Sequence, residues 1–178
     1  MTPQEIRNKR LKNDFHEMEN IRGDVISWKP LKGTKPYIEE YELTINVKTI
    51  VDEMPEYSYM QKMKVVLPAR YPDVAPEIRM IDKPFPYHPN WYKDGKWCFG
   101  TWFMAESLGN HIIRMIKTLQ YDKDITNEHS PANRDANIWY KENKNSHLFP
   151  CDRSRLPDPS ISKKPFKIKK KPTFTITG

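Results

Sequence analysis

The chain has 178 residues, of which 37% are hydrophobic and 30% charged, a composition typical of a globular protein and not of a disordered one. This length suits one domain with its own hydrophobic core and a short appendage. No stretch is long and apolar enough to span a membrane, and the N-terminal segment lacks the apolar core of a signal peptide, so we expect a cytoplasmic protein. The two cysteines, Cys98 and Cys151, have no C-x-x-C spacing, which excludes a disulfide framework and fits a reducing compartment.

The net charge of +7 is concentrated at the C-terminal end of the chain. Residues 153–178 contain eight Lys or Arg and one acid, which leaves 22 bases and 22 acids in residues 1–152. Four prolines and the absence of periodicity in this stretch predict a mobile basic extension. We favour a solvated, solubilising tail, and the alternative is an arm that binds a partner. We therefore predict a folded domain at 1–150 and a basic Pro/Lys-rich tail at 151–178. Nucleic acid is a poor candidate partner, because the tail alone would give only weak, salt-sensitive binding.

A helix is predicted from the first residues. Thr2-Pro3-Gln4-Glu5 is a capping box with proline at the first helical position. Leu11, Phe15 and Met18 then form an apolar stripe at helical spacing. From Val25 the period changes to two and predicts four strands, at 25–28, 41–47, 63–67 and 77–81. The short connections between these strands indicate an antiparallel meander.

An irregular segment, 82–105, follows the strands and is long enough to be functional. The stripe from Leu108 to Leu119 predicts a second helix, and Ser130-Pro131 is expected to open a third. Helices and strands segregated in this way indicate an α+β fold, with helices packed on the sheet.

Cys98 lies in the irregular segment, eight residues after Asn90 of a His88-Pro89-Asn90 motif. A cysteine can be a buried small hydrophobe, a metal ligand or a nucleophile. A metal site of His88, Cys98 and either His111 or His129 lacks paired-ligand spacing. A papain-like protease is excluded because its histidine and asparagine come far downstream of the cysteine, whereas here both precede it closely.

Several motifs together resemble the ubiquitin-conjugating enzymes. That family has a Tyr-Pro turn after its third strand, a His-Pro-Asn, a glycine shortly before the catalytic cysteine, a tryptophan after it, and a Ser-Pro-Ala-Asn-like turn before a late helix. The matching residues are Tyr71-Pro72, Pro76, His88-Pro89-Asn90, Gly95, Cys98, Trp102, Ser130-Pro131-Ala132-Asn133 and Asp135-Ala136. With the order of the predicted elements, the resemblance covers about residues 1–145. The resemblance implies that Cys98 carries a ubiquitin-like C-terminus as a thioester and passes it to a lysine.

The resemblance also implies roles for neighbouring residues. Asn90 would donate to the oxyanion or order the active-site loop, and the sequence does not separate these roles. Ser130 would help to accept the lysine, or would simply cap the helix that follows. His88 is interpreted as organising its turn, and Cys151 matches no motif.

The implied partners are a ubiquitin-like protein and an activating enzyme that contacts the first helix, and no cofactor or metal is expected. Candidate contacts on that helix are Arg7, Lys9, Arg10 and Lys12. An alternative is a catalytically silent relative that only binds ubiquitin, but such variants usually lack the cysteine that is present here.

Some positions depart from the family pattern. They are Asp73, Ala75, Trp97 and Trp102. Asp73 stands where an aromatic often docks ligases, and Trp102 is closer to the cysteine than usual. These departures suggest a divergent member that works with an unusual ligase, with none, or with a ubiquitin-like protein other than ubiquitin.

Overall fold

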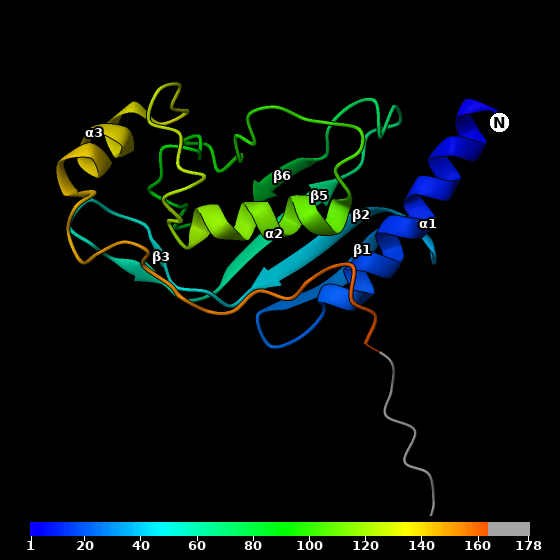
Figure 1. The fold of residues 1–178 in the computed structure, drawn as a ribbon, viewed down its shortest axis with the longest axis horizontal. Coiled ribbons are helices and arrows are strands. Elements are labelled where there is room, and N and C mark those ends of the chain that lie inside the picture. Colours follow the sequence, from blue (N-terminus) through cyan, green and yellow to red (C-terminus); the bar gives the residue numbers. More distant parts are fainter. Residues whose placement is uncertain (164–178) are drawn as a thin grey trace, which may run out of the picture.

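The structure, a computed structural model, describes residues 1–163 of the chain (Figure 1). In chain order, its elements are α1 (Pro3–Ile21), β1 (Ile26–Thr34), β2 (Tyr37–Ile45), β3 (Thr49–Ile50), β4 (Tyr57–Ser58), β5 (Gln61–Val66), β6 (Glu77–Met80), α2 (Leu108–Leu119) and α3 (Arg134–Asn143). Among the described residues, no helix is long and apolar enough to cross a membrane.

The predicted antiparallel meander is confirmed. Strands β1, β2, β5 and β6 form one sheet in that order, and β2 pairs through Leu43 with Trp28 on one side and Met63 on the other. Strands β3 and β4 form a separate short hairpin, which the sequence pattern did not predict.

β1 runs further than its sequence pattern indicated, through Pro30 to Thr34. A proline lacks the backbone N–H that a central strand needs, but β1 is an edge strand, where this loss is tolerated. Gly33 lies beside a register shift in this strand at φ 94°, and a Cβ there would come 2.3 Å from the carbonyl oxygen of Tyr37. The position therefore requires glycine.

Helices α1 and α2 pack on the same hydrophobic core as the sheet, and Figure 1 shows α2 lying across it. The predicted capping box of α1 is present, since the Thr2 hydroxyl accepts from the Glu5 backbone and the Glu5 carboxylate accepts from the Thr2 backbone. Trp28 in β1 donates from its indole to the Met18 carbonyl at 2.8 Å. This bond fixes α1 on the sheet while burying the indole N–H with a partner.

A buried ion pair ties α1 to the rest of the domain. The carboxylate of Asp14, 1% exposed, accepts from Arg10 at 2.9 Å, from the Tyr71 hydroxyl at 2.5 Å and from the Leu108 backbone at 3.0 Å. One carboxylate thus joins α1, the Tyr-Pro turn and the start of α2. Removing one partner of such a network costs several kcal/mol, because a charge is left buried and unpaired.

The last helix begins later than predicted. Ser130 does not cap it; the N-cap is Asn133, whose side chain accepts from the Ala136 backbone at 3.2 Å. The backbone of Ala132 donates to the Pro89 carbonyl at 2.7 Å, so residues 130–132 belong to a loop attached to the His-Pro-Asn turn. This interaction with a distant segment could not be seen in the local Ser-Pro pattern.

The first part of the predicted tail packs on the domain. In Figure 1 it runs in orange from α3, past β3, to the end of α1. Asp152 accepts from the Lys48 backbone at 2.8 Å, and Pro159 is buried and accepts from Asn20 at 2.8 Å. A Cβ at Gly109 of α2 would lie 2.7 Å from Pro159, so the approach is close.

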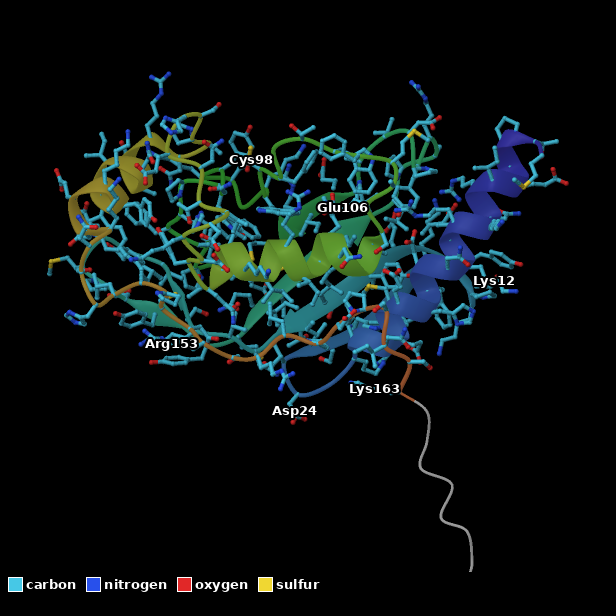
Figure 2. All side chains as sticks on the ribbon, in the orientation of Figure 1. Lys12, Asp24, Cys98, Glu106, Arg153 and Lys163 are labelled. Carbon is cyan, nitrogen blue, oxygen red and sulfur yellow. The ribbon has the colours of Figure 1, made fainter. Side chains whose placement is uncertain are left out.

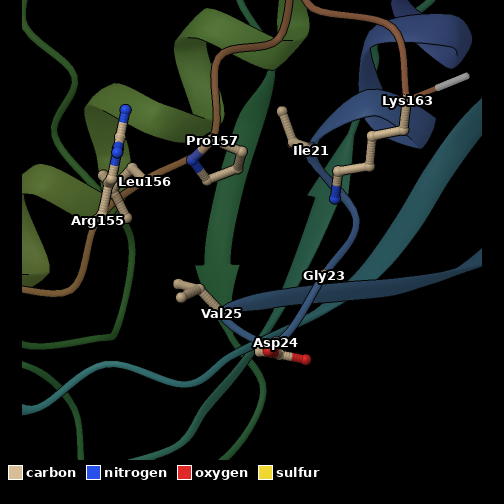
Figure 3. Close-up of a pocket in the computed structure, with 8 residues that line it drawn as sticks. All are labelled: Ile21, Gly23, Asp24, Val25, Arg155, Leu156, Pro157 and Lys163. Atoms are coloured by element: carbon tan, nitrogen blue, oxygen red, sulfur yellow. The ribbon is translucent and has the colours of Figure 1, made fainter.

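Figure 3 shows where this segment passes the start of β1. A shallow pocket of about 290 Å³ lies there, lined by Ile21, Gly23, Asp24, Val25, Arg155, Leu156, Pro157 and Lys163. The expectation of a mobile extension from residue 153 is therefore wrong for residues 153–159. Residues 164–178, which carry five of the eight tail bases, lie outside the described residues.

Candidate active site

Lys96 and Trp97, which precede Cys98, pair with β6 at the edge of the sheet. Figure 2 shows Cys98 at the surface above α2. The Trp97 backbone donates to Ile78 of β6 at 2.9 Å, and the Cys98 backbone donates to the Asn90 carbonyl at 2.8 Å. Trp97 is 1% exposed, whereas Cys98 is partly exposed. The alternation of an extended segment thus buries the indole and leaves the thiol accessible, which disfavours the interpretation of Cys98 as a core residue.

The thiol lines a groove of about 500 Å³. Its other lining residues are Arg79, Tyr92, Asp94, Lys96, Trp97, Phe99 and Gly100. Gly95, at φ 87°, makes the turn that brings Cys98 back toward Asn90, and a Cβ there would lie 3.1 Å from the Phe85 ring. A groove of this size beside an exposed thiol can hold an extended peptide end.

Tyr92 is a site residue that the sequence interpretation missed. Its side chain lines the same groove as Cys98, and the neighbouring Cys98 raises the pKa of Tyr92. The only sequence signal was its place two residues after Asn90. An exposed tyrosine is otherwise unremarkable, so only the fold reveals that it faces the thiol.

His88 holds the turn that presents Asn90. Its Nδ1 accepts from the Asn90 backbone at 2.9 Å, and its ring lies 4.2 Å from that of Tyr121. Burial lowers the pKa of His88 to about 3, so the ring is neutral at physiological pH with its proton on Nε2. These contacts fit the interpretation of His88 as a structural residue.

The side chain of Asn90 points to the loop that precedes α3. Its Oδ1 accepts from the Asn127 backbone at 3.0 Å, and its amide nitrogen lies 3.5 Å from the Ile125 carbonyl. These contacts support a loop-ordering role. The second amide hydrogen has no protein partner in the described part of the chain, so an oxyanion role stays compatible with the geometry.

Ser130 lies in the same loop and is exposed. Its backbone donates at 3.1 Å to the Asn127 side chain, whose own backbone donates to Asn90. The structure therefore brings Asn90 and Ser130 together through Asn127. With the capping role assigned to Asn133, the Ser130 hydroxyl is free of that task.

Cys151 is also partly exposed, but its thiol is held within the fold. Its Sγ donates toward the carbonyls of Lys48 at 3.3 Å and Leu119 at 3.4 Å. Burial, followed by the nearby charge of Asp152, raises the pKa of the Cys151 thiol to about 12. A thiol that stays protonated at neutral pH is a poor nucleophile, so Cys151 serves as an internal control.

Two of the four bases proposed as partner contacts on α1 are occupied within the chain. Arg7 pairs with Glu39 at 3.0 Å, and Arg10 is committed to Asp14. Lys9 is exposed, and so is Lys12, which Figure 2 labels on α1. No group of three or more potential metal ligands occurs within residues 1–163.

Comparison with known proteins identifies the fold. No protein family profile matches the sequence. A segment of 86 residues, 48% of the chain, is 30% identical to Ubiquitin-conjugating enzyme E2 1 of Caenorhabditis elegans, and it spans 44% of that protein, so the chain matches less than half of this curated relative. The structure of human Ubiquitin-conjugating enzyme E2 G1 is similar with a TM-score of 0.50 and 18% identity, over 67% of this chain and 97% of that chain. The predicted fold class, α+β with the ubiquitin-conjugating-enzyme arrangement, is confirmed.

Proposed function

We propose that the chain is a ubiquitin-conjugating-type transferase that carries ubiquitin or a ubiquitin-like protein as a thioester on Cys98. The observation that supports this most is the position of the thiol. The thiol is partly exposed and lines a groove, and the backbone of Cys98 is joined to the His-Pro-Asn turn. The fold shared with a solved ubiquitin-conjugating enzyme supports the same interpretation.

The reaction has two acyl transfers. In the first, the Cys98 thiolate attacks the carbonyl of the C-terminus held as a thioester on an activating enzyme, whose thiolate leaves. In the second, a neutral lysine amine attacks the Cys98 thioester, the C–S bond breaks as the amide forms, and the amine gives up a proton to solvent. The acyl group arrives already activated, so the chain itself needs no bound cofactor for either transfer.

The surroundings of Cys98 suit the second transfer. Asn90 contacts the 122–133 loop through Asn127, and in this proposal its amide N–H donates to the oxyanion, as a side-chain amide does in other acyl-transfer enzymes. Tyr92 borders the thiol, and Ser130 lies on the loop that Asn90 holds. We assign these three residues and Cys98 to the site.

The proposed partners follow from this function. An activating enzyme would contact α1 through Lys9 and Lys12, the two exposed bases of the four predicted contacts. A ligase, if one takes part, meets Asp73 where an aromatic is common, so its docking surface differs from the usual one. The free, partly exposed thiol of Cys98 is consistent with a reducing compartment such as the cytoplasm.

A silent ubiquitin-binding relative is the second candidate. It would keep the fold without needing an accessible thiol, whereas here the thiol is partly exposed and faces a groove. Incubation with ATP, an activating enzyme and ubiquitin, followed by non-reducing electrophoresis, separates the two. The transferase gives an adduct that thiol reductants break, in wild type and in Cys151→Ala and not in Cys98→Ala; the silent relative gives none in any variant. If ubiquitin gives no adduct, the assay is repeated with other ubiquitin-like proteins and their own activating enzymes.

A further inference from the structure

The segment that follows Cys98 has little backbone support. Up to Cys98 the chain is held by bonds to Ile78 and Asn90, but α2 begins only at Leu108. Between Phe99 and Glu106, the one backbone–backbone hydrogen bond among the described residues joins Glu106 to Phe103, at 2.8 Å. Side chains from elsewhere must therefore set the position of the peptide next to the thiol.

Two side chains from the helices reach this segment, and one side chain of the segment itself reaches outward. Trp102 donates its indole N–H to Pro72 at 2.8 Å, and Arg10 donates to the carbonyls of Met104 and Glu106. Nearest to the thiol is Arg114 of α2, which donates from Nη1 to the Phe99 carbonyl at 2.5 Å. The carbonyl of Phe99 lies one peptide beyond Cys98, so Arg114 is the first anchor after the sulfur-bearing residue.

Arg114 is itself held in a fixed orientation. Its Nε and Nη2 donate to the two oxygens of Glu106 at 2.8 and 2.9 Å, and its guanidinium lies over the Trp97 ring at 5.2 Å. Burial alone would raise the pKa of Glu106, but hydrogen bonds from His111 and Arg114 lower it to about 2. The carboxylate is therefore ionised at neutral pH and keeps the two-pronged ion pair intact.

His111 packs behind Arg114, among the aromatic rings around Cys98. His111, fully buried, lies 4.8 Å from the Trp97 ring, 5.6 Å from Phe99 and 5.0 Å from Trp102. Its Nδ1 is 3.3 Å from Arg114. The guanidinium fork thus joins α2, the residue before Cys98 and the residue after it.

We propose that Arg114 is a positioning residue that fixes the peptide after Cys98 and so aims the thioester for attack by the incoming amine. This inference rests on the proposed function. Arg114 acts through Phe99 and Trp97 and touches no reacting atom. A lysine could donate to the Phe99 carbonyl as a point charge, but it could not also clamp Glu106 with two bonds. Misplacement of reacting groups by about 1 Å can cost about a hundredfold in rate.

The test compares Arg114→Ala and Arg114→Lys with Arg22→Ala. Arg22 is a matched control, since it stacks on Trp28 at 4.0 Å, donates to the Trp28 carbonyl at 3.0 Å and pairs with Glu19, all at the end of α1. We expect transfer of the acyl group from the Cys98 thioester to free lysine, here called discharge, to slow about tenfold to a hundredfold in Arg114→Ala. The rate should fall less in Arg114→Lys. Arg22→Ala should discharge at the wild-type rate.

Chemical rescue distinguishes positioning from general loss of structure. Guanidinium at low millimolar concentration, far below denaturing levels, should restore part of the discharge rate of Arg114→Ala and leave wild type and Arg22→Ala unchanged. A wild-type discharge rate in Arg114→Ala, or an equal loss in Arg22→Ala without rescue, would overturn the proposal.

A second readout needs no partner protein and so separates this inference from the proposed function. Chymotrypsin should cleave between Phe99 and Trp102 about tenfold faster in Arg114→Ala than in wild type or Arg22→Ala, because cleavage reports local opening. If wild type never forms a thioester, the proposed function fails. The cleavage rates then still test whether Arg114 anchors the segment after Cys98. Equal cleavage rates in all three proteins would refute the anchoring role of Arg114.

Discussion

The backbone N–H of Asn127 donates to the side-chain oxygen of Asn90 at 3.0 Å. This bond joins two segments that are 37 residues apart in sequence. The same asparagine accepts from the Cys98 backbone through its own carbonyl. Asn90 therefore links Cys98 to the loop that carries Ser130. Its side-chain oxygen holds this loop, while its side-chain nitrogen is the candidate oxyanion donor, so the two roles can be tested separately.

Substitutions at Asn90 separate loop ordering from oxyanion donation. Asn90→Asp keeps an oxygen to accept from Asn127 but loses the amide donor, while Asn90→Ala loses both. If the donor matters, we expect both variants to slow transfer to lysine by about a hundredfold, the scale of losing one oxyanion donor. If ordering alone matters, Asn90→Asp should retain most of the activity. Single-turnover discharge measures both, and wild-type kinetics in both variants would remove Asn90 from the mechanism.

The cap of α3 gives a test of what Ser130 does. Asn133→Ala should lower the free energy of unfolding by about 1 kcal/mol, because the Ala136 N–H loses its acceptor. Ser130→Ala should leave that free energy unchanged, since its hydroxyl caps nothing. Urea titration measures both, and a loss in Ser130→Ala equal to that in Asn133→Ala would contradict the assignment of the cap. If Ser130→Ala slows lysine transfer while keeping its stability, the remaining role is at the site.

His88 should make the protein less stable in acid. Burial lowers its pKa from 6.5 to about 3 in the folded state, so the unfolded chain binds a proton that the folded chain does not. The stabilisation is fully present above pH 6.5 and is lost as pH falls toward 3, by about 1.4 kcal/mol per pH unit from this residue. His111, also lowered by burial, adds in the same direction.

The slope of unfolding free energy between pH 6 and pH 4 measures this contribution. His88→Gln should have a slope shallower than wild type by about 1.4 kcal/mol per pH unit, whatever its absolute stability. Coincident slopes for wild type and His88→Gln would show that the ring is not held neutral.

The C-terminal segment should divide into a packed part and a charged part. Truncation after Asp152 removes Leu156, which packs against the core, and the buried Pro159, so thermal stability should fall. Truncation after Lys163 keeps these contacts and removes five lysines. We expect it to keep the melting temperature and to slow transfer mainly at low salt, as for long-range attraction to an acidic partner. Equal melting temperatures for the two truncations would contradict the packing of residues 153–159.

Local patterns in the sequence predicted most of the fold. The capping box at Thr2, the alternation of β2 and the stripe of α2 are each encoded within a few neighbouring residues, and each appears as expected. The late start of α3 depends on a bond from Ala132 to Pro89, which no local pattern reports. The extension of β1 through Pro30 depends on its place at the sheet edge.

The candidate site could be predicted from the sequence where its residues form a motif. It could not be predicted where residues distant in sequence meet only through packing. His88, Asn90 and Cys98 stand in a recognisable order, so their neighbourhood could be expected. Arg114 lies on a helix that reads as plain amphipathic, and its contact with Phe99 exists only because α2 packs beneath the Cys98 segment. Side chains that act across such distances have no signature in spacing alone.

The site of acyl attachment is the most direct measurement of the central claim. The protein is charged with ubiquitin or the ubiquitin-like protein that gives an adduct, digested under non-reducing conditions and analysed by mass spectrometry. We expect the acyl group to lie on Cys98 and a thiol to remove it. Cys98→Ser should give an adduct that resists thiol, because an oxygen ester does not exchange in the same way. Attachment to Cys151, or a reductant-sensitive adduct that persists in Cys98→Ala, would contradict this claim.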